Sequence, residues 1–178
     1  KAFAVVYDPA EGFVTGGGWF TSPTNAYTPD NAFDAEVGGV AEFGFVSKYK
    51  KGASVPTGNT VFELLSGDFE FHSTSYDWLV VNNAKASFEG TGEVTSSRPE
   101  LDAAEYKFRV TLRDADVNTT DSFDQDSIRV RIWEERPDGT EWVVYDSGRG
   151  SNDDGTEAGM TLLGGGSIKI HVPKGKAK

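Results

Sequence analysis

The sequence predicts an all-β fold, an antiparallel β-sandwich with meander connections, and two observations support this prediction. Apolar and polar residues alternate with a period of two along much of the chain, as in strands that turn one face to a core and the other to water. No segment carries the apolar stripe of an amphipathic helix. The number and spacing of the predicted strands also fit a closed or partly open antiparallel β-barrel, which is the alternative.

The alternation is clearest in the segments 106–113, 128–132 and 168–172. Further strands are predicted where β-branched and aromatic residues lie between Gly, Asn, Asp and Pro, at residues 3–7, 12–20, 40–50, 60–73, 77–81, 84–94 and 141–147. Segment 22–37 contains two prolines and no helical stripe, so we expect a long loop there, held to the body by Tyr27 and Phe33.

The length of 178 residues fits one domain. We expect a single all-β domain over residues 12–173, preceded by a linker or the last strand of a preceding repeat at 1–11 and followed by a polar tail at 174–178. The absence of Cys excludes disulfides, thiolate metal ligands and a Cys nucleophile. The net charge of -11 opposes binding to nucleic acid. Insertion into a membrane is not expected, because no apolar run approaches the roughly 20 residues that span a bilayer.

Several segments together resemble a known family of domains. They are GFVTGGGWF, AEFGFVSKYKKGASVPTGNTVFEL, FHSTSYDWLVVNNAKASFEGTGEV, DSIRVRIWEE and WVVYDS, and they extend over residues 12–172. In these segments the chain resembles the post-COAP-1 domain, a C-terminal module of large secreted bacterial multidomain surface proteins.

The resemblance implies a secreted or cell-surface bacterial all-β module without an established catalytic activity. From this resemblance and from the absence of catalytic motifs, we expect a non-enzymatic module with a structural or adhesive role. The resemblance also implies neighbouring domains of a longer chain as partners, and it transfers no catalytic residue. Self-association through exposed edge strands is a further possibility that uncapped sheets carry.

The most acidic part of the chain is the segment DADVNTTDSFDQD, residues 114–126, called here the acidic segment. Calcium binds six to eight oxygen ligands, chiefly from carboxylates and carbonyls. The candidate calcium ligands are Asp114, Asp116, Asn118, Asp121, Asp124 and Asp126. The spacing does not match an EF-hand, and a solvated acidic turn is the alternative.

Two features indicate a carbohydrate-binding module as the alternative function. Strand parity places a strip of basic residues on the solvent faces of two strands, where it could bind an anionic polysaccharide. The alternative is that these basic residues pair across strands with Glu63, Glu70, Glu89 or Glu93. The strip consists of Lys107, Arg109, Arg113, Arg129 and Arg131. Parity also turns Trp133 outward, as a candidate surface for sugar stacking, whereas Trp19 and Trp78 are expected in the core.

Catalytic signals are weak. The segment FHSTSYDW holds His72, Ser73, Ser75 and Asp77, but neighbouring strand residues point to opposite faces, so a catalytic triad is not expected. A glycosidase is the third hypothesis, and it requires a cleft with two carboxylates about 5 to 10 Å apart.

Overall fold

The fold is one antiparallel sheet, seen in a computed structural model that describes residues 12–29, 37–117, 124–151 and 159–172. The all-β prediction is confirmed. The strands are β1 (Phe13–Ser22), β2 (Gly39–Tyr49), β3 (Pro56–Leu64), β4 (Phe69–Asn82), β5 (Lys85–Thr95), β6 (Tyr106–Arg113), β7 (Ser127–Glu135), β8 (Glu141–Asp146), β9 (Thr161–Leu162) and β10 (Gly165–His171). A short 3-10 helix, η1 (Leu65–Gly67), joins β3 to β4. None of the described segments is a helix long and apolar enough to span a membrane.

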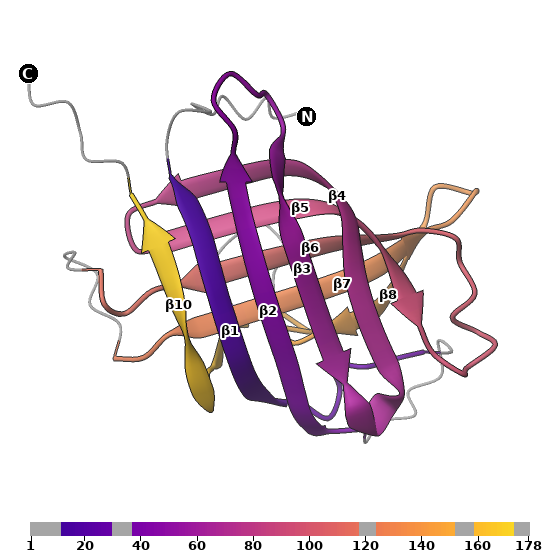
Figure 1. The fold of residues 1–178 in the computed structure, drawn as a ribbon. Helices are drawn as coiled ribbons and strands as arrows, with labels where there is room; N and C mark the ends of the chain where they lie inside the picture. Colours follow the sequence, from indigo (N-terminus) through magenta and orange to yellow (C-terminus); the bar gives the residue numbers. More distant parts are fainter. Residues whose placement is uncertain (1–11, 30–36, 118–123, 152–158, 173–178) are drawn as a thin grey trace, which may run out of the picture.

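The 10-stranded sheet has the order β10-β1-β2-β3-β4-β5-β6-β7-β8, with β9 paired to β7. In Figure 1, β10 and β1 to β3 form a front layer, and β5 to β8 cross behind it. The long strand β4 passes from one layer to the other. Its register shifts between Ser73 and Ser75 and again between Tyr76 and Trp78, and such bulges bend a strand. The two layers therefore belong to one folded sheet, which does not close into a barrel.

The core lies between the two layers and is rich in aromatic rings. Phe62 contacts Tyr145 with ring centroids 4.5 Å apart, and Phe71 contacts Phe108 at 5.2 Å, so both pairs join the front half of the sheet to the rear half. Burying a Phe side chain contributes about 1.5–3 kcal/mol. The alternating inward residues of each strand supply these rings, in agreement with the predicted period of two.

The predicted loop at 22–37 is anchored by Tyr27, which is fully buried. Its hydroxyl donates a hydrogen bond to the carbonyl of Gly67 at 3.0 Å. Phe33, the second predicted anchor, lies outside the described residues, as do the predicted strand at 3–7, the linker 1–11 and the tail 174–178.

The outer edge of β8 is covered by residues 26–28. The amide of Thr28 donates to the carbonyl of Val144 at 2.8 Å, and the amide of Asp146 donates to the carbonyl of Ala26 at 2.9 Å. The guanidinium of Arg149 donates to the carbonyl of Val143 at 3.0 Å. Because these edge groups are engaged within the chain, pairing of β8 with a second copy requires residues 26–28 to be displaced.

Candidate functional site

A groove of about 510 Å³ runs over the outer face of β1 to β4. We call it the outer-face groove, and its exposed or half-exposed lining includes Trp19, Glu42, Gly44, Val61, Glu63, Glu70 and His72. Each of these residues has the parity opposite to the core residues of its strand, so the sheet itself forms the base of the groove.

Carboxylates from three neighbouring strands stand side by side in this groove. In the strand register Glu42 is opposite Glu63, and Glu63 is opposite Glu70; we call these three residues the acidic row. Like charges directly opposite each other destabilise a sheet. Within the described part of the chain, Glu42 and Glu63 form no ion pair with Lys or Arg, and Glu70 contacts His72 at 2.7 Å. The row therefore concentrates negative charge on one patch.

Glycine makes the floor of the groove low. Gly17, Gly44, Val61 and His72 follow one another across β1 to β4 in the strand register, in the row next to the carboxylates. A Cβ atom added at Gly44 would meet only the Val61 side chain, at 3.4 Å, so the space above the glycine is open. Glycine thus exposes backbone where other residues would place side chains that fill the groove.

Trp19 closes one end of the acidic row, because it lies opposite Glu42 in the register. The residue is 40% exposed. Its ring lies close against Gly164 and Gly165: an added Cβ would be 2.1 Å from Cζ3 at the first glycine and 2.6 Å from Nε1 at the second. The ring is thus supported by backbone on one side and accessible on the other.

The prediction that Trp19 belongs to the core is wrong. Val14 and Phe20 are fully buried, and Trp19 has the opposite parity to both, so the correct signal was present in the sequence. The Gly-rich run before Trp19 obscured this alternation. The close fit of Gly164 and Gly165 under the ring comes from a segment almost 150 residues away along the chain, and only the structure shows it.

The prediction that Trp133 offers an exposed ring is also wrong, since Trp133 is 3% exposed. Its parity is opposite to that of Ile132, but two guanidinium groups cover it. The Arg131 guanidinium lies 4.4 Å from the ring centroid and the Arg109 guanidinium lies 5.9 Å from it. Strand parity gives the face on which a side chain lies, but it does not give what covers that face.

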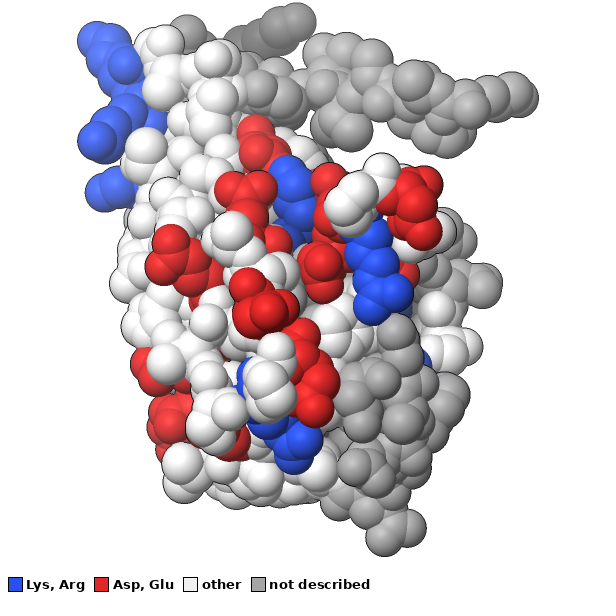
Figure 2. All heavy atoms as spheres, turned by 90° about the vertical axis from the view of Figure 1, so that its right-hand side faces the viewer, with Lys and Arg blue, Asp and Glu red and all other residues white. Residues whose placement is uncertain are grey.

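Ion pairs across strands occupy most of the predicted basic strip. Arg109 bonds to Glu89 at 2.7 Å, as the cross-strand alternative anticipated. Arg131 bonds to Glu141 at 2.7 Å and Lys107 to Asp77 at 3.2 Å. Figure 2, which views the right-hand side of Figure 1, shows basic side chains set among acidic ones. The strip does not form a uniformly positive surface for an anionic polysaccharide.

Arg129 belongs to the same strip, and its ion pair with Asp146 is the most buried of those described for the strip. Its Nε and one terminal nitrogen donate to the two carboxylate oxygens of Asp146 at 3.0 and 2.9 Å. Both side chains are 8% exposed. The remaining predicted partners, Glu63, Glu70 and Glu93, lie on exposed positions of β3, β4 and β5 and do not pair with the strip in the described residues.

The ends of the acidic segment hold the last strand. Asp114 accepts hydrogen bonds from the amides of Ile170 and Asp116 at 2.7 and 3.0 Å. Asp126 accepts from the amides of Ile168 and Ala115 at 2.7 and 2.8 Å. The amides of Ile168 and Ile170 lie on the outer edge of β10, opposite to the edge that pairs with β1. The two carboxylates therefore cover that edge as a partner strand would, which sequence spacing could not show.

The other predicted calcium ligands are placed differently. Asp116 forms an ion pair with Lys169, Asp124 is exposed, and Asn118 and Asp121 lie outside the described residues. Among the residues that are described, no three His, Asp or Glu side chains are grouped so that they could hold a metal ion.

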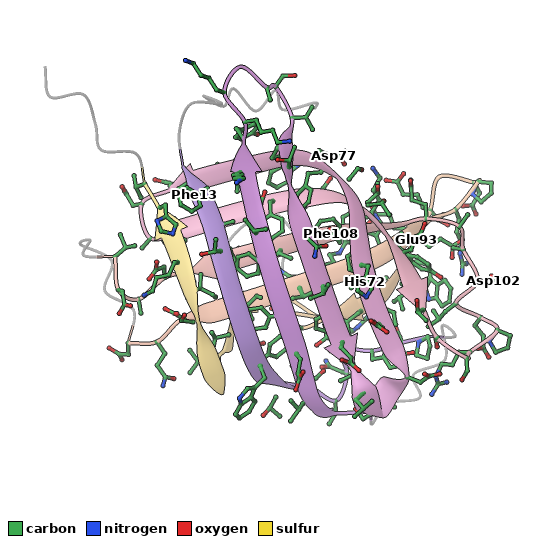
Figure 3. The ribbon with its side chains drawn as sticks, viewed as in Figure 1. Phe13, His72, Asp77, Glu93, Asp102 and Phe108 are labelled. Atoms are coloured by element: carbon green, nitrogen blue, oxygen red, sulfur yellow. The ribbon has the colours of Figure 1, made fainter. Side chains whose placement is uncertain are left out.

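The residues of the segment FHSTSYDW do not form a catalytic arrangement. Ser73 accepts the amide hydrogen bond of Thr60 at 2.8 Å, and the Ser75 hydroxyl bonds to the Thr91 hydroxyl at 2.7 Å. His72 and Asp77 lie well apart along β4 (Figure 3). The serine hydroxyls instead satisfy polar groups at the bend of the strand.

Comparison of the chain with family models, curated proteins and solved structures found no match.

Proposed function

We propose that the protein is a non-enzymatic β-module with an adhesive role that binds polysaccharide in the outer-face groove. The observation that carries the proposal is the ring of Trp19, supported on one side by Gly164 and Gly165 and 40% exposed. An aromatic ring held in place keeps its stacking surface without losing side-chain entropy on binding. Tryptophan combines a large apolar face with a polar N–H, which suits it to ligands that have both kinds of surface.

The rest of the groove complements a sugar chain. The apolar face of a pyranose ring stacks on an aromatic face, and its hydroxyl groups donate hydrogen bonds to carboxylates, which accept at both oxygens. Glu42 is next to Trp19 in the register, so a sugar on the ring has a carboxylate beside it. The low floor at Gly44 leaves room for the next unit of the chain.

Binding without hydrolysis is supported by the exposure of the carboxylates. Residues on adjacent strands are about 4.8 Å apart, so the acidic row spans separations that glycosidases use. A glycosidase also needs one carboxylic acid kept protonated by an apolar environment. Glu42, Glu63 and Glu70 are all exposed to water on an open sheet face, which favours their role as hydrogen-bond acceptors.

The proposed setting is outside the cell, on a secreted or surface-displayed bacterial protein. An all-β domain that contains no Cys needs neither a reducing nor an oxidising compartment. The resemblance to secreted surface modules supports the same setting, and in it a sugar-binding face gives a structural module its adhesive role.

A glycan array tests the proposal. We expect the chain to bind a defined polysaccharide class and Trp19→Ala to abolish the binding. Phe13→Ala is the matched control, because Phe13 is 38% exposed but lies on β1 away from the groove, stacked on His171 (Figure 3). Absence of binding to any glycan, equal loss in both variants, or release of shorter glycans by the intact chain contradicts the proposal.

A further inference from the structure

We infer that the outer-face groove selects polysaccharides of cationic amino sugars, a more specific statement that rests on the proposed function. The inference comes from the charge of the groove. Its titratable lining residues are Glu42, Glu63, Glu70 and His72, and no Lys or Arg of the described residues lines it. An anionic polysaccharide would bring its charges against the acidic row, on a chain with a net charge of -11.

The arrangement of the acidic row matches a ligand with repeated positive charges. Glu42, Glu63 and Glu70 repel one another across β2, β3 and β4, and protonated amines between them turn this repulsion into attraction. Hydrogen bonds between an ammonium group and a carboxylate are stronger than those between neutral groups. A polymer with one amine on each sugar unit places several such groups along the row at once.

Two features favour a sugar over a basic peptide as the occupant. The aromatic end of the row is a ring supported by backbone, which provides a flat stacking surface. An extended peptide binds a sheet mainly by adding to a free edge. One outer edge is covered by residues 26–28 and the other by Asp114 and Asp126, so the groove is an open face that offers side chains and no edge for strand addition.

The test is a titration of the intact chain, at about pH 6, with three probes of matched length. At this pH sugar amines carry protons. The probes are a β-linked glucosamine oligomer, its fully N-acetylated form and an oligolysine. We expect the glucosamine oligomer to bind at least about tenfold more tightly than the acetylated one. The preference should vanish near 1 M salt, where the screening length is about 3 Å.

Variants assign the effect to the groove. Glu63→Gln keeps the shape of the side chain and removes its charge, and it should reduce binding of the glucosamine oligomer toward that of the acetylated one. Glu135→Gln removes the same charge from an exposed position at the end of β7 and should leave binding unchanged. Trp19→Ala should abolish the binding of both sugars.

The outcomes separate this inference from the proposed function. Equal binding of both sugar oligomers through Trp19 overturns the charge selection and leaves the polysaccharide-binding function in place. Failure of both oligomers, together with a silent glycan array, overturns both proposals. Binding of oligolysine that is as tight as that of the amino sugar and insensitive to Trp19→Ala overturns the inference in favour of a basic peptide.

Discussion

Asp114 accepts a hydrogen bond from the backbone amide of Ile170 at 2.7 Å, across 56 residues of sequence. Asp114 is 2% exposed, so the contact lies away from water. With Asp126, which accepts from Ile168, it gives the edge strand β10 side-chain partners on the side where no described strand pairs with it. The acidic segment thus has a structural role at both of its ends.

Asp114→Ala should lower the free energy of unfolding by about 1–3 kcal/mol, because a buried amide loses its only strand-like acceptor. Urea denaturation followed by tryptophan fluorescence measures the change. Asp124→Ala, at an exposed position of the same segment, is the control and should stay within about 0.5 kcal/mol. Equal effects of the two substitutions would contradict the role of Asp114.

Asp146→Ala should destabilise the fold by about 3–5 kcal/mol, because it leaves the buried guanidinium of Arg129 without its carboxylate. Denaturant melts give the value. Glu141→Gln breaks the ion pair of Arg131 at a side chain that is 47% exposed, and it should cost at most about 1 kcal/mol. Equal losses in the free energy of unfolding for Asp146→Ala and Glu141→Gln would contradict the prediction.

Trp133 should contribute to stability and Trp19 to binding, the reverse of the roles that the sequence analysis predicts for these two residues. Trp133→Ala removes a buried ring and should lower the free energy of unfolding by about 3–5 kcal/mol, with glycan binding unaffected in the protein that remains folded. Trp19→Ala should cost about 1 kcal/mol and abolish binding. Parallel thermal melts and glycan titrations distinguish the two, and the reverse pattern would show that Trp133 carries the site.

Alkaline pH should unfold the protein through its buried tyrosines. Burial raises the pKa of Tyr27 to about 12 and also raises the pKa of Tyr145. The neutral phenol is thus favoured in the fold, so its contribution to stability is complete below about pH 10, the unfolded value, and is lost as the pH rises toward 12. Melting temperatures should fall over this range.

Absorbance of tyrosinate measures the ionisation directly. We expect the most alkaline ionisation step to coincide with loss of the fold, and Tyr27→Phe to make the melting temperature fall less steeply with pH. Complete ionisation of all tyrosines near pH 10 in a protein that remains folded would disprove this prediction.

Calcium binding by the acidic segment stays a prediction. A ligand that binds only the folded state at 100 times its dissociation constant adds about 2.7 kcal/mol, which corresponds to about 5–10 °C in this size class. We expect the melting temperature in excess calcium to be higher than the melting temperature in EDTA by this amount. Asp116→Ala with Asp124→Ala should remove the rise, since Asp114 and Asp126 already accept amide hydrogen bonds. Identical melts in calcium and EDTA would refute calcium binding.

Alternation in the sequence predicts β6, β7 and β10 with their inward residues, and composition between turn residues predicts most of the other strands. Phe108 and Val110, for example, are buried as their alternation with Lys107 and Arg109 indicates. Alternation is local, and it reports on the two faces of each strand independently. The single folded sheet could not be predicted in this way, because its shape depends on two bulges in β4 that change the register only with respect to β5.

The candidate groove was inaccessible to sequence reasoning for a related reason. Glu42 is about twenty residues from Glu63 along the chain, and which glutamates on β2, β3 and β4 lie opposite one another depends on the register. Strand register is set by turns and packing across the whole sheet. The outward direction of Trp19 could have been predicted from its parity, whereas the support that Gly164 gives to its ring is a tertiary contact that only the structure shows.

The pairing of β1 with β10 also determines how the domain responds to mechanical force. Phe13 and His171 are opposite each other in the register and their rings stack at 3.8 Å, so the described chain enters and leaves at the same corner. Tension applied at these two residues pulls across the hydrogen bonds of the ladder, and the bonds break one after another as in a zipper. The domain should therefore open at low force, with β10 parting from β1 first, and extend under tension while the rest of the sheet is still folded.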